Sequence, residues 1–136
     1  LVLLEASQYT CAEEMANLQP LANVRALFHL GDTRYDDDHI HGAVVVRNDS
    51  AITQLSQILD KVVEGTSVYD LGGYQLQWDE IMRRGLSFLA SLKQLRMVGS
   101  HDDSRVLEDV AAGEVDVGFV KAGSLQQAEH EGRVAL

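Results

Sequence analysis

The chain has 136 residues, of which 46% are hydrophobic and 24% are charged, the usual mixture for a globular domain. This length supports one domain with a hydrophobic core but is too short for two complete domains. The formal net charge of −10 argues against nucleic acid or an anionic membrane surface as the main partner, although a local pocket can still hold an anion.

Strand-like and helix-like patterns alternate along the chain. Alternating apolar positions and short β-branched runs predict strands, and apolar residues three or four apart predict amphipathic helices. The predicted elements are a strand over 1–5, a helix over 7–18, a strand over 23–30, a polar loop over 31–41, a strand over 42–47, a helix over 52–59, a strand over 61–67 and a helix over 74–84. Strands that alternate with helices form βαβ units, so we expect an α/β fold with a mainly parallel sheet and helices on both faces.

The segment 95–123 carries the clearest local signals. It predicts a short strand, a Gly-Ser-His-Asp turn, a helix and a second strand. Ser100 or Asp102 is a suitable N-cap for the helix, and Gly113 lies where a C-cap belongs. Apolar and polar residues alternate over 115–119, which predicts a half-buried strand.

Three further features of the sequence bear on the cellular origin of the protein. Cys11 is the only cysteine, so the chain cannot form an internal disulfide. The cysteine content therefore does not indicate whether the protein resides in an oxidising or a reducing compartment. No apolar run approaches the roughly 20 residues that cross a bilayer. Because the chain starts on Leu1 rather than on methionine, we expect a processed or excised piece of a longer protein.

Three blocks of the sequence, in this order, resemble the phosphonate-binding periplasmic protein family and its relatives in the sensor domains of bacterial two-component histidine kinases. The blocks are GAVVVRNDSAITQL from residue 42, KVVEGTSVYDLGGYQLQWDEIMRRG from residue 61, and GSHD at 99–102 followed by GEVDVGFV at 113–120. Residues 1–30 resemble the family more loosely, so the resemblance covers nearly the whole chain.

The resemblance implies a type II periplasmic-binding-protein-like fold, in which two lobes close on a solute in the cleft between them. Complete members of the family are much longer, so this chain is expected to hold one nearly complete lobe and part of the other. We expect residues 46–120 to form the second lobe, and residues 1–45 and 121–136 to belong to the first. Together they would make a single solute-binding domain fragment.

The run Gly72-Gly73-Tyr74 is the first candidate binding site. It opens a helix after a strand and presents backbone N–H groups at the carboxyl end of the sheet, where ligands of open α/β sheets bind. The two glycines can equally serve close packing of the helix on the sheet. The resembled family carries a Ser/Thr cluster here, and Asp70 and Leu71 replace it. An added carboxylate opposes a doubly charged phosphonate, which argues against phosphonate as the ligand.

The resemblance also implies that His101 and Asp116 line the cleft. The turn places His101 beside the N–H groups at a helix start, which suits an anion. Lys121 is a candidate to balance an anion, and Tyr9 and Tyr74 are candidate aromatic walls. Ordinary roles stay open for all five residues: a capping turn, an outward-facing strand position, an exposed lysine and two core tyrosines.

The polar loop over 31–41 invites a metal-site interpretation. Its candidate ligands are Asp36, Asp37, Asp38, His39 and His41. They lie in one loop without a spaced partner motif, so a solvated acidic loop is the preferred interpretation, and no metal or cofactor is expected. The sequence also lacks a G-x-S-x-G elbow, and no histidine motif accompanies Cys11. We therefore expect a domain that is not an enzyme, and a metal-dependent enzyme remains the weaker alternative.

The resemblance implies an extracytoplasmic ligand-sensing domain that binds a small solute, anionic or otherwise, and signals to a histidine kinase. The membrane would be reached only through a parent protein. Alternatives are the substrate-binding component of an ABC-type uptake system for a phosphonate-like anion and the effector-binding domain of a transcription regulator. A homodimer is also open, because an incomplete lobe leaves sheet edges uncovered. The expected location is the bacterial periplasm, and the sequence does not name the ligand.

Overall fold

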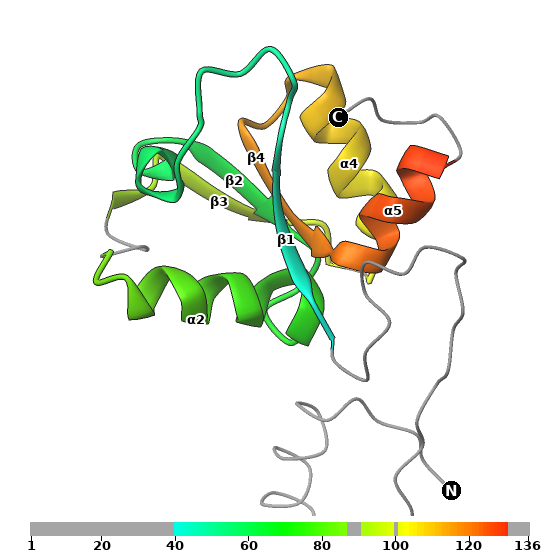
Figure 1. Cartoon of the computed structure of the whole chain (residues 1–136), viewed down its shortest axis with the longest axis horizontal. Coiled ribbons are helices and arrows are strands. Elements are labelled where there is room, and N and C mark those ends of the chain that lie inside the picture. The colour runs from blue at the N-terminus through cyan, green and yellow to red at the C-terminus, as the bar shows by residue number, and fades with distance from the viewer. Residues whose placement is uncertain (1–39, 87–90, 100, 131–136) are drawn as a thin grey trace, which may run out of the picture. The chain divides into compact units, whose positions relative to one another are not determined.

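The computed structural model describes residues 40–86, 91–99 and 101–130 of the chain (Figure 1). The chain divides into two compact units, Leu1–Ile40 and His41–Leu136. The elements predicted over 1–30, the acidic residues of the polar loop and Tyr9 lie outside the described residues.

Strands and helices alternate through the described part of the chain. In order they are β1 (Gly42–Val46), η2 (Leu55–Ile58), β2 (Val62–Gly65), η3 (Leu71–Gln75), α2 (Leu76–Arg83), β3 (Gln94–Met97), α4 (Asp103–Ala112), β4 (Val117–Lys121) and α5 (Ala122–His130). The short η2 is a 3-10 helix, and η3 is a π-helical turn that continues directly into α2.

The four strands form one sheet in the order β1-β4-β2-β3. β2 runs parallel to β3 and β4, whereas β1 pairs antiparallel with β4. The chain passes from β2 through α2 to β3 at the edge, and then through α4 back across β2 to β4. The order in which successive strands join the sheet therefore reverses at β2, with β3 on one side of β2 and β4 on the other. This mainly parallel α/β sheet confirms the predicted fold class.

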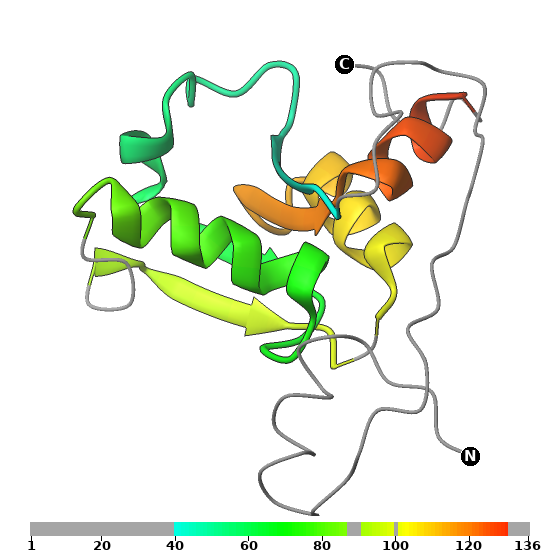
Figure 2. The same cartoon turned by 60° about the horizontal axis from the view of Figure 1, so that its bottom comes forward.

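Helices cover both faces of the sheet, with α2 on one side and α4 and α5 on the other (Figures 1 and 2). The core on the α2 face comprises Ile58, Val63, Tyr74, Ile81, Val117 and Phe119. The core on the α4 face comprises Val45, Val106, Leu107, Val110, Val115, Val120 and Ala128. β1 and α5 both contribute to the core on the α4 face, through Val45 and Ala128, so they pack with the central elements. The predicted lobe boundaries at 45 and 121 stay predictions.

The prediction that the last strand is half-buried is wrong. All residues of β4 except Lys121 are buried, because β4 lies between β1 and β2 and has a helix layer on each face. Gly118 allows this packing. A Cβ atom built there would lie 2.8 Å from Val110 Cγ2 and 2.9 Å from Val106 Cγ1 and from Val45 Cγ2. Glycine thus stands where side chains of α4 and β1 pack directly against the strand.

The predicted helices are confirmed to different extents. α4 begins after Asp102, whose carboxylate accepts a hydrogen bond from the Ser104 N–H, and it ends at Gly113 with φ 76°. The helix predicted over 52–59 is only the single turn η2. Its length is limited because Leu59 is already extended and Asp60 takes a positive φ of 63°, a conformation that cannot continue a helix.

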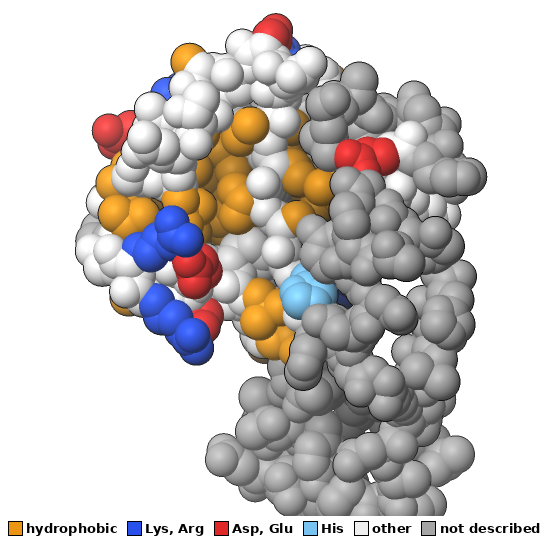
Figure 3. Space-filling model, in the orientation of Figure 1, with side chains coloured by type: hydrophobic (Ala, Val, Ile, Leu, Met, Phe, Trp, Pro, Cys, Tyr) orange, Lys and Arg blue, Asp and Glu red, His pale blue; other side chains and the backbone are white. Residues whose placement is uncertain are grey.

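The outer face of α2 is charged and solvent-exposed. Ion pairs join Asp79 to Arg83 and Glu80 to Arg84. Acidic and basic side chains lie together on this part of the surface in Figure 3. Hydrophobic side chains gather beside them, over the sheet (Figure 3). Among the described residues, no helix has the length and apolar character needed to cross a membrane.

Candidate functional site

Polar side chains from three strands meet at the carboxyl end of the sheet. Asp70 follows β2, His101 follows β3, and Lys121 is the last residue of β4. Parallel strands end at the same edge, so these residues come together although up to 51 positions separate them in the chain. The winding of the sheet reverses between β2 and β4, and the crevice beside such a reversal is where open α/β sheets bind ligands.

Asp70 is the centre of this cluster, and its side chain is fully buried. Oδ2 accepts hydrogen bonds from Lys121 Nζ at 2.7 Å, Thr66 Oγ1 at 3.0 Å and His101, whose Nδ1 lies at 2.8 Å. Oδ1 accepts a hydrogen bond from the Gly73 N–H at 2.9 Å. Burial alone would raise the pKa of this carboxyl group, but the bonds from Lys121, His101, Gly73 and Thr66 outweigh burial and lower the pKa to about 2.

The turn η3 lies against this carboxylate through its glycines. Asp70 is the N-cap of η3, and its carboxylate accepts from Gly73 at the first turn. A Cβ atom at Gly73 would overlap Thr66 Oγ1, so the hydroxyl could not lie beside Asp70 if any other residue stood at this position. Both glycines are buried. The close-packing role of Gly73 is therefore present, and its N–H is bound to protein.

A second buried carboxylate supports Lys121 from the α4 side. Asp103 accepts hydrogen bonds from the Lys121 N–H at 3.3 Å and from Ser124 Oγ at 2.6 Å. Its Oδ2 also lies 3.8 Å from Lys121 Nζ. The ammonium group is thus held between Asp70 and Asp103. One negative charge remains in excess when His101 is neutral.

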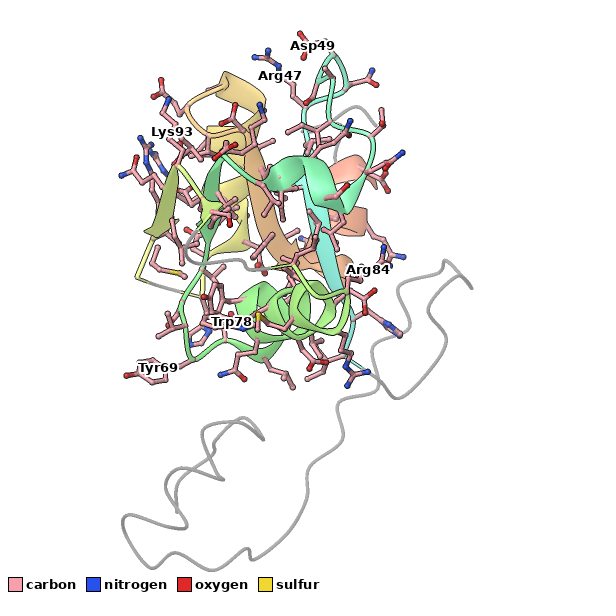
Figure 4. All side chains as sticks on the ribbon, turned by 90° about the vertical axis from the view of Figure 1, so that its left-hand side faces the viewer. Arg47, Asp49, Tyr69, Trp78, Arg84 and Lys93 are labelled. Atoms are coloured by element: carbon pink, nitrogen blue, oxygen red, sulfur yellow. The ribbon has the colours of Figure 1, made fainter. Side chains whose placement is uncertain are left out.

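The part of the cluster that reaches solvent consists of His101 and Lys121. Their side chains are 45% and 30% exposed, whereas those of the two carboxylates are 0% and 6% exposed. Val68 and Tyr69 flank Asp70 in the loop after β2 and are also exposed, and Figure 4 shows Tyr69 pointing away from the sheet. A solute at this exposed corner of the sheet, formed by His101 and Lys121, would meet an imidazole and an ammonium group.

The structure places the other predicted site residues elsewhere. Tyr74 is a core residue, with its ring 5.4 Å from Trp78 and 6.3 Å from Phe119, centroid to centroid, and burial raises the pKa of its hydroxyl to about 12. Asp116 precedes β4, and its carboxylate accepts a hydrogen bond from the Val62 N–H at the start of β2. The structure therefore places Asp116 at the end of the sheet opposite to His101.

Sequence reasoning missed the central role of Asp70 and did not single out Thr66. In the sequence, Asp70 stands out only as a replacement for the Ser/Thr cluster of the resembled family. Its position just before a Gly-Gly helix start was an available signal, because an aspartate there commonly caps the helix. Nothing in the sequence links Asp70 to Lys121. Among residues 40–86, 91–99 and 101–130, no group of three or more histidine, cysteine or acidic residues is arranged to hold a metal ion.

Comparisons with known proteins agree with the resemblance noted in the sequence. Residues 1–136 match the family described as "ABC transporter, phosphonate, periplasmic substrate-binding protein". No curated protein matches the chain.

Two solved structures of XAC2383 from Xanthomonas citri, one described as bound to ATP and one as bound to chloride ion, are similar in fold. Each is 26% identical, with TM-scores of 0.57 and 0.55 respectively. In both comparisons the similarity covers 67% of this chain and 36% of the Xanthomonas chain, so the matched region spans about a third of that protein.

Proposed function

We propose that this chain, which belongs to the family of periplasmic substrate-binding proteins of phosphonate ABC transporters, binds its solute at the carboxyl end of β2, β3 and β4. The family is a solute-binding class without enzymatic activity, and it implies an extracytoplasmic location. The observation that supports this site is the cluster of Asp70, His101 and Lys121 at the reversal of the sheet.

The solute contacts in this proposal come from His101 and Lys121. The Nδ1 atom of His101 faces Asp70, so Nε2 is the ring nitrogen that remains for a solute. Lys121 is fixed by two carboxylates, which reduces the conformational entropy lost when its ammonium group binds. Closure of the other lobe of the family's fold over this corner would remove both side chains from water and couple solute binding to a conformational change.

The proposed cellular role is that of the substrate-binding component of an ABC-type uptake system, which is the role in the family description. The second candidate is a sensor domain that signals to a histidine kinase through a membrane-anchored parent, with a homodimer as its signalling unit. Asp70 favours this candidate, because a carboxylate replaces the Ser/Thr cluster of the resembled transport proteins. Uptake of a radiolabelled solute that depends on the protein would support the transport role. Solute-dependent autophosphorylation of a parent kinase would support the sensor role.

A nucleotide that presents its neutral base, rather than its phosphates, to His101 and Lys121 is a specific candidate for the solute. The similar Xanthomonas citri structure is described as bound to ATP. Comparing ATP with adenosine would separate base recognition from phosphate recognition.

Isothermal titration of the full chain tests the proposed site. The probes are ATP, adenosine, glycine, ethanolamine, inorganic phosphate and methylphosphonate. We expect at least one probe to bind, and we expect His101→Ala and Lys121→Ala each to weaken its binding at least tenfold. Lys93→Ala is the matched control, because Lys93 lies at the opposite end of the sheet (Figure 4). Binding that survives both site substitutions would refute this location.

A further inference from the structure

The contacts of Asp70 form a complete oxyanion site that holds a side chain of the protein. Four donors surround this one carboxylate: a backbone N–H at a helix start, a hydroxyl, an imidazole nitrogen and an ammonium group. These are the donor types that proteins use to hold phosphate and phosphonate oxygens. All four lie 2.7 to 3.0 Å from an Asp70 oxygen.

An incoming oxyanion would have to displace Asp70 from these donors. The carboxylate is fully buried, so losing its partners would leave an unpaired charge without access to water, which is strongly unfavourable. A dianion bound without displacement would lie beside Asp70 and Asp103, and Lys121 already serves both carboxylates. Even a protonated His101 brings this group only to neutrality, so the corner offers no excess positive charge to a dianion.

We propose that Asp70 is a resident anion that fills the oxyanion position of this lobe, so that the solute presents a neutral or cationic hydrogen-bonding group here rather than a phosphonate dianion. This inference rests on the proposed function, since it concerns the solute of the same corner. It assigns Asp70 as a specificity-determining residue that orients His101 and Lys121. The solute meets His101 and the exposed face of Lys121, and the anion-binding donors behind them stay occupied.

Removing the carboxylate tests this inference by gain of binding. Asp70→Ser vacates the donors and restores a hydroxyl, and Asp70→Asn keeps the shape while removing the charge. For methylphosphonate we expect no measurable binding by the wild type, weak binding by Asp70→Asn and at least tenfold tighter binding by Asp70→Ser than by Asp70→Asn. Asp116→Ser is the control, because it makes the same change of residue at the opposite end of the sheet and should leave methylphosphonate unbound.

The amide resonance of Gly73 provides a second readout, since its N–H donates to Asp70 in the wild type. Methylphosphonate should shift this resonance in Asp70→Ser and leave it unchanged in the wild type. If the serine variant does not fold, the comparison of Asp70→Asn with the wild type decides. The inference is wrong if methylphosphonate binds the wild type and the variants with equal affinity and also shifts the Gly73 resonance of the wild type. A probe whose binding ignores His101→Ala and Lys121→Ala would refute the proposed site and leave the gain of methylphosphonate binding as a separate result.

Discussion

Replacing Gly118 with alanine should destabilise the domain strongly. The added Cβ atom would come within 2.8 to 2.9 Å of methyl groups of three buried valines, and real Cβ atoms essentially never approach other atoms to less than 3.0 Å. Val106 and Val110 belong to α4 and Val45 belongs to β1, so relief requires the helix or the strand to move away from β4. Overpacking of this kind costs about 2 kcal/mol.

The matched control is Gly123→Ala. Gly123 lies in α5, and a Cβ atom there would meet no atom within 4 Å. Alanine favours a helix over glycine, so this substitution should stabilise the domain by about 0.5 kcal/mol. The same chemical change is thus expected to have opposite signs at two sites five residues apart.

Urea denaturation followed by circular dichroism, together with thermal melting, measures both changes. For a unit of this size a loss of about 2 kcal/mol lowers Tm by roughly 8–16 °C. A Gly118→Ala variant within about 0.5 kcal/mol of the wild type would refute the argument that Gly118 determines the distance between α4 and β4.

Three further predictions concern buried polar groups. The pKa of Asp70 is lowered from 3.8 to about 2, so its stabilising contribution is complete above pH 4 and is lost as the pH falls towards 2. Between pH 4 and pH 2, the free energy of unfolding of Asp70→Asn should therefore fall by about 2 kcal/mol less than that of the wild type, as measured by urea denaturation. The pKa of Glu64 is raised above 4.5 by burial and by the nearby Asp109, so stability is complete below pH 4.5 and falls as the pH rises through the raised value. Glu64→Gln should therefore increase stability at pH 7.5, and equal urea midpoints at that pH would contradict this. Gln77 Nε2 donates to the backbone oxygens of Ala43, Gly72 and Val120, at 2.7 to 3.1 Å. Gln77→Glu should lower stability by about 3 kcal/mol or more, because it directs a charge at three carbonyl oxygens, whereas the exposed Gln94→Glu should change the urea midpoint little.

The proposed specificity also has a consequence for the resembled family. A serine or threonine cluster at the start of η3 would leave the Gly73 N–H available to an external anion. Asp70 instead supplies the anion from within the chain. One substitution at a helix start thus changes the charge that the same backbone geometry accepts.

Local signals in the sequence determined most of the secondary structure. The Asp102 cap, the αL glycine at Gly113 and helical spacing between them predicted α4, because capping and amphipathic spacing act within a few residues. The alternation of strands and helices predicted an α/β fold with a mainly parallel sheet. The family resemblance drew attention to the Gly-Gly turn and to His101, which the structure brings together at Asp70.

Only the tertiary structure decided how deeply β4 is buried, how long η2 is and which residues form the candidate site. β4 is buried because β1 and β2 pair with its two edges and helices cover both of its faces, and contacts between distant segments leave no local pattern. Asp116 lies at the wrong end of the sheet for the cluster, because a residue that precedes a strand lies at the edge opposite to one that follows a parallel strand. Lys121 meets Asp70 across 51 positions because β2 and β4 are adjacent and parallel. Strand order brings these charges together, and strand order depends on packing between elements rather than on any single segment of the sequence.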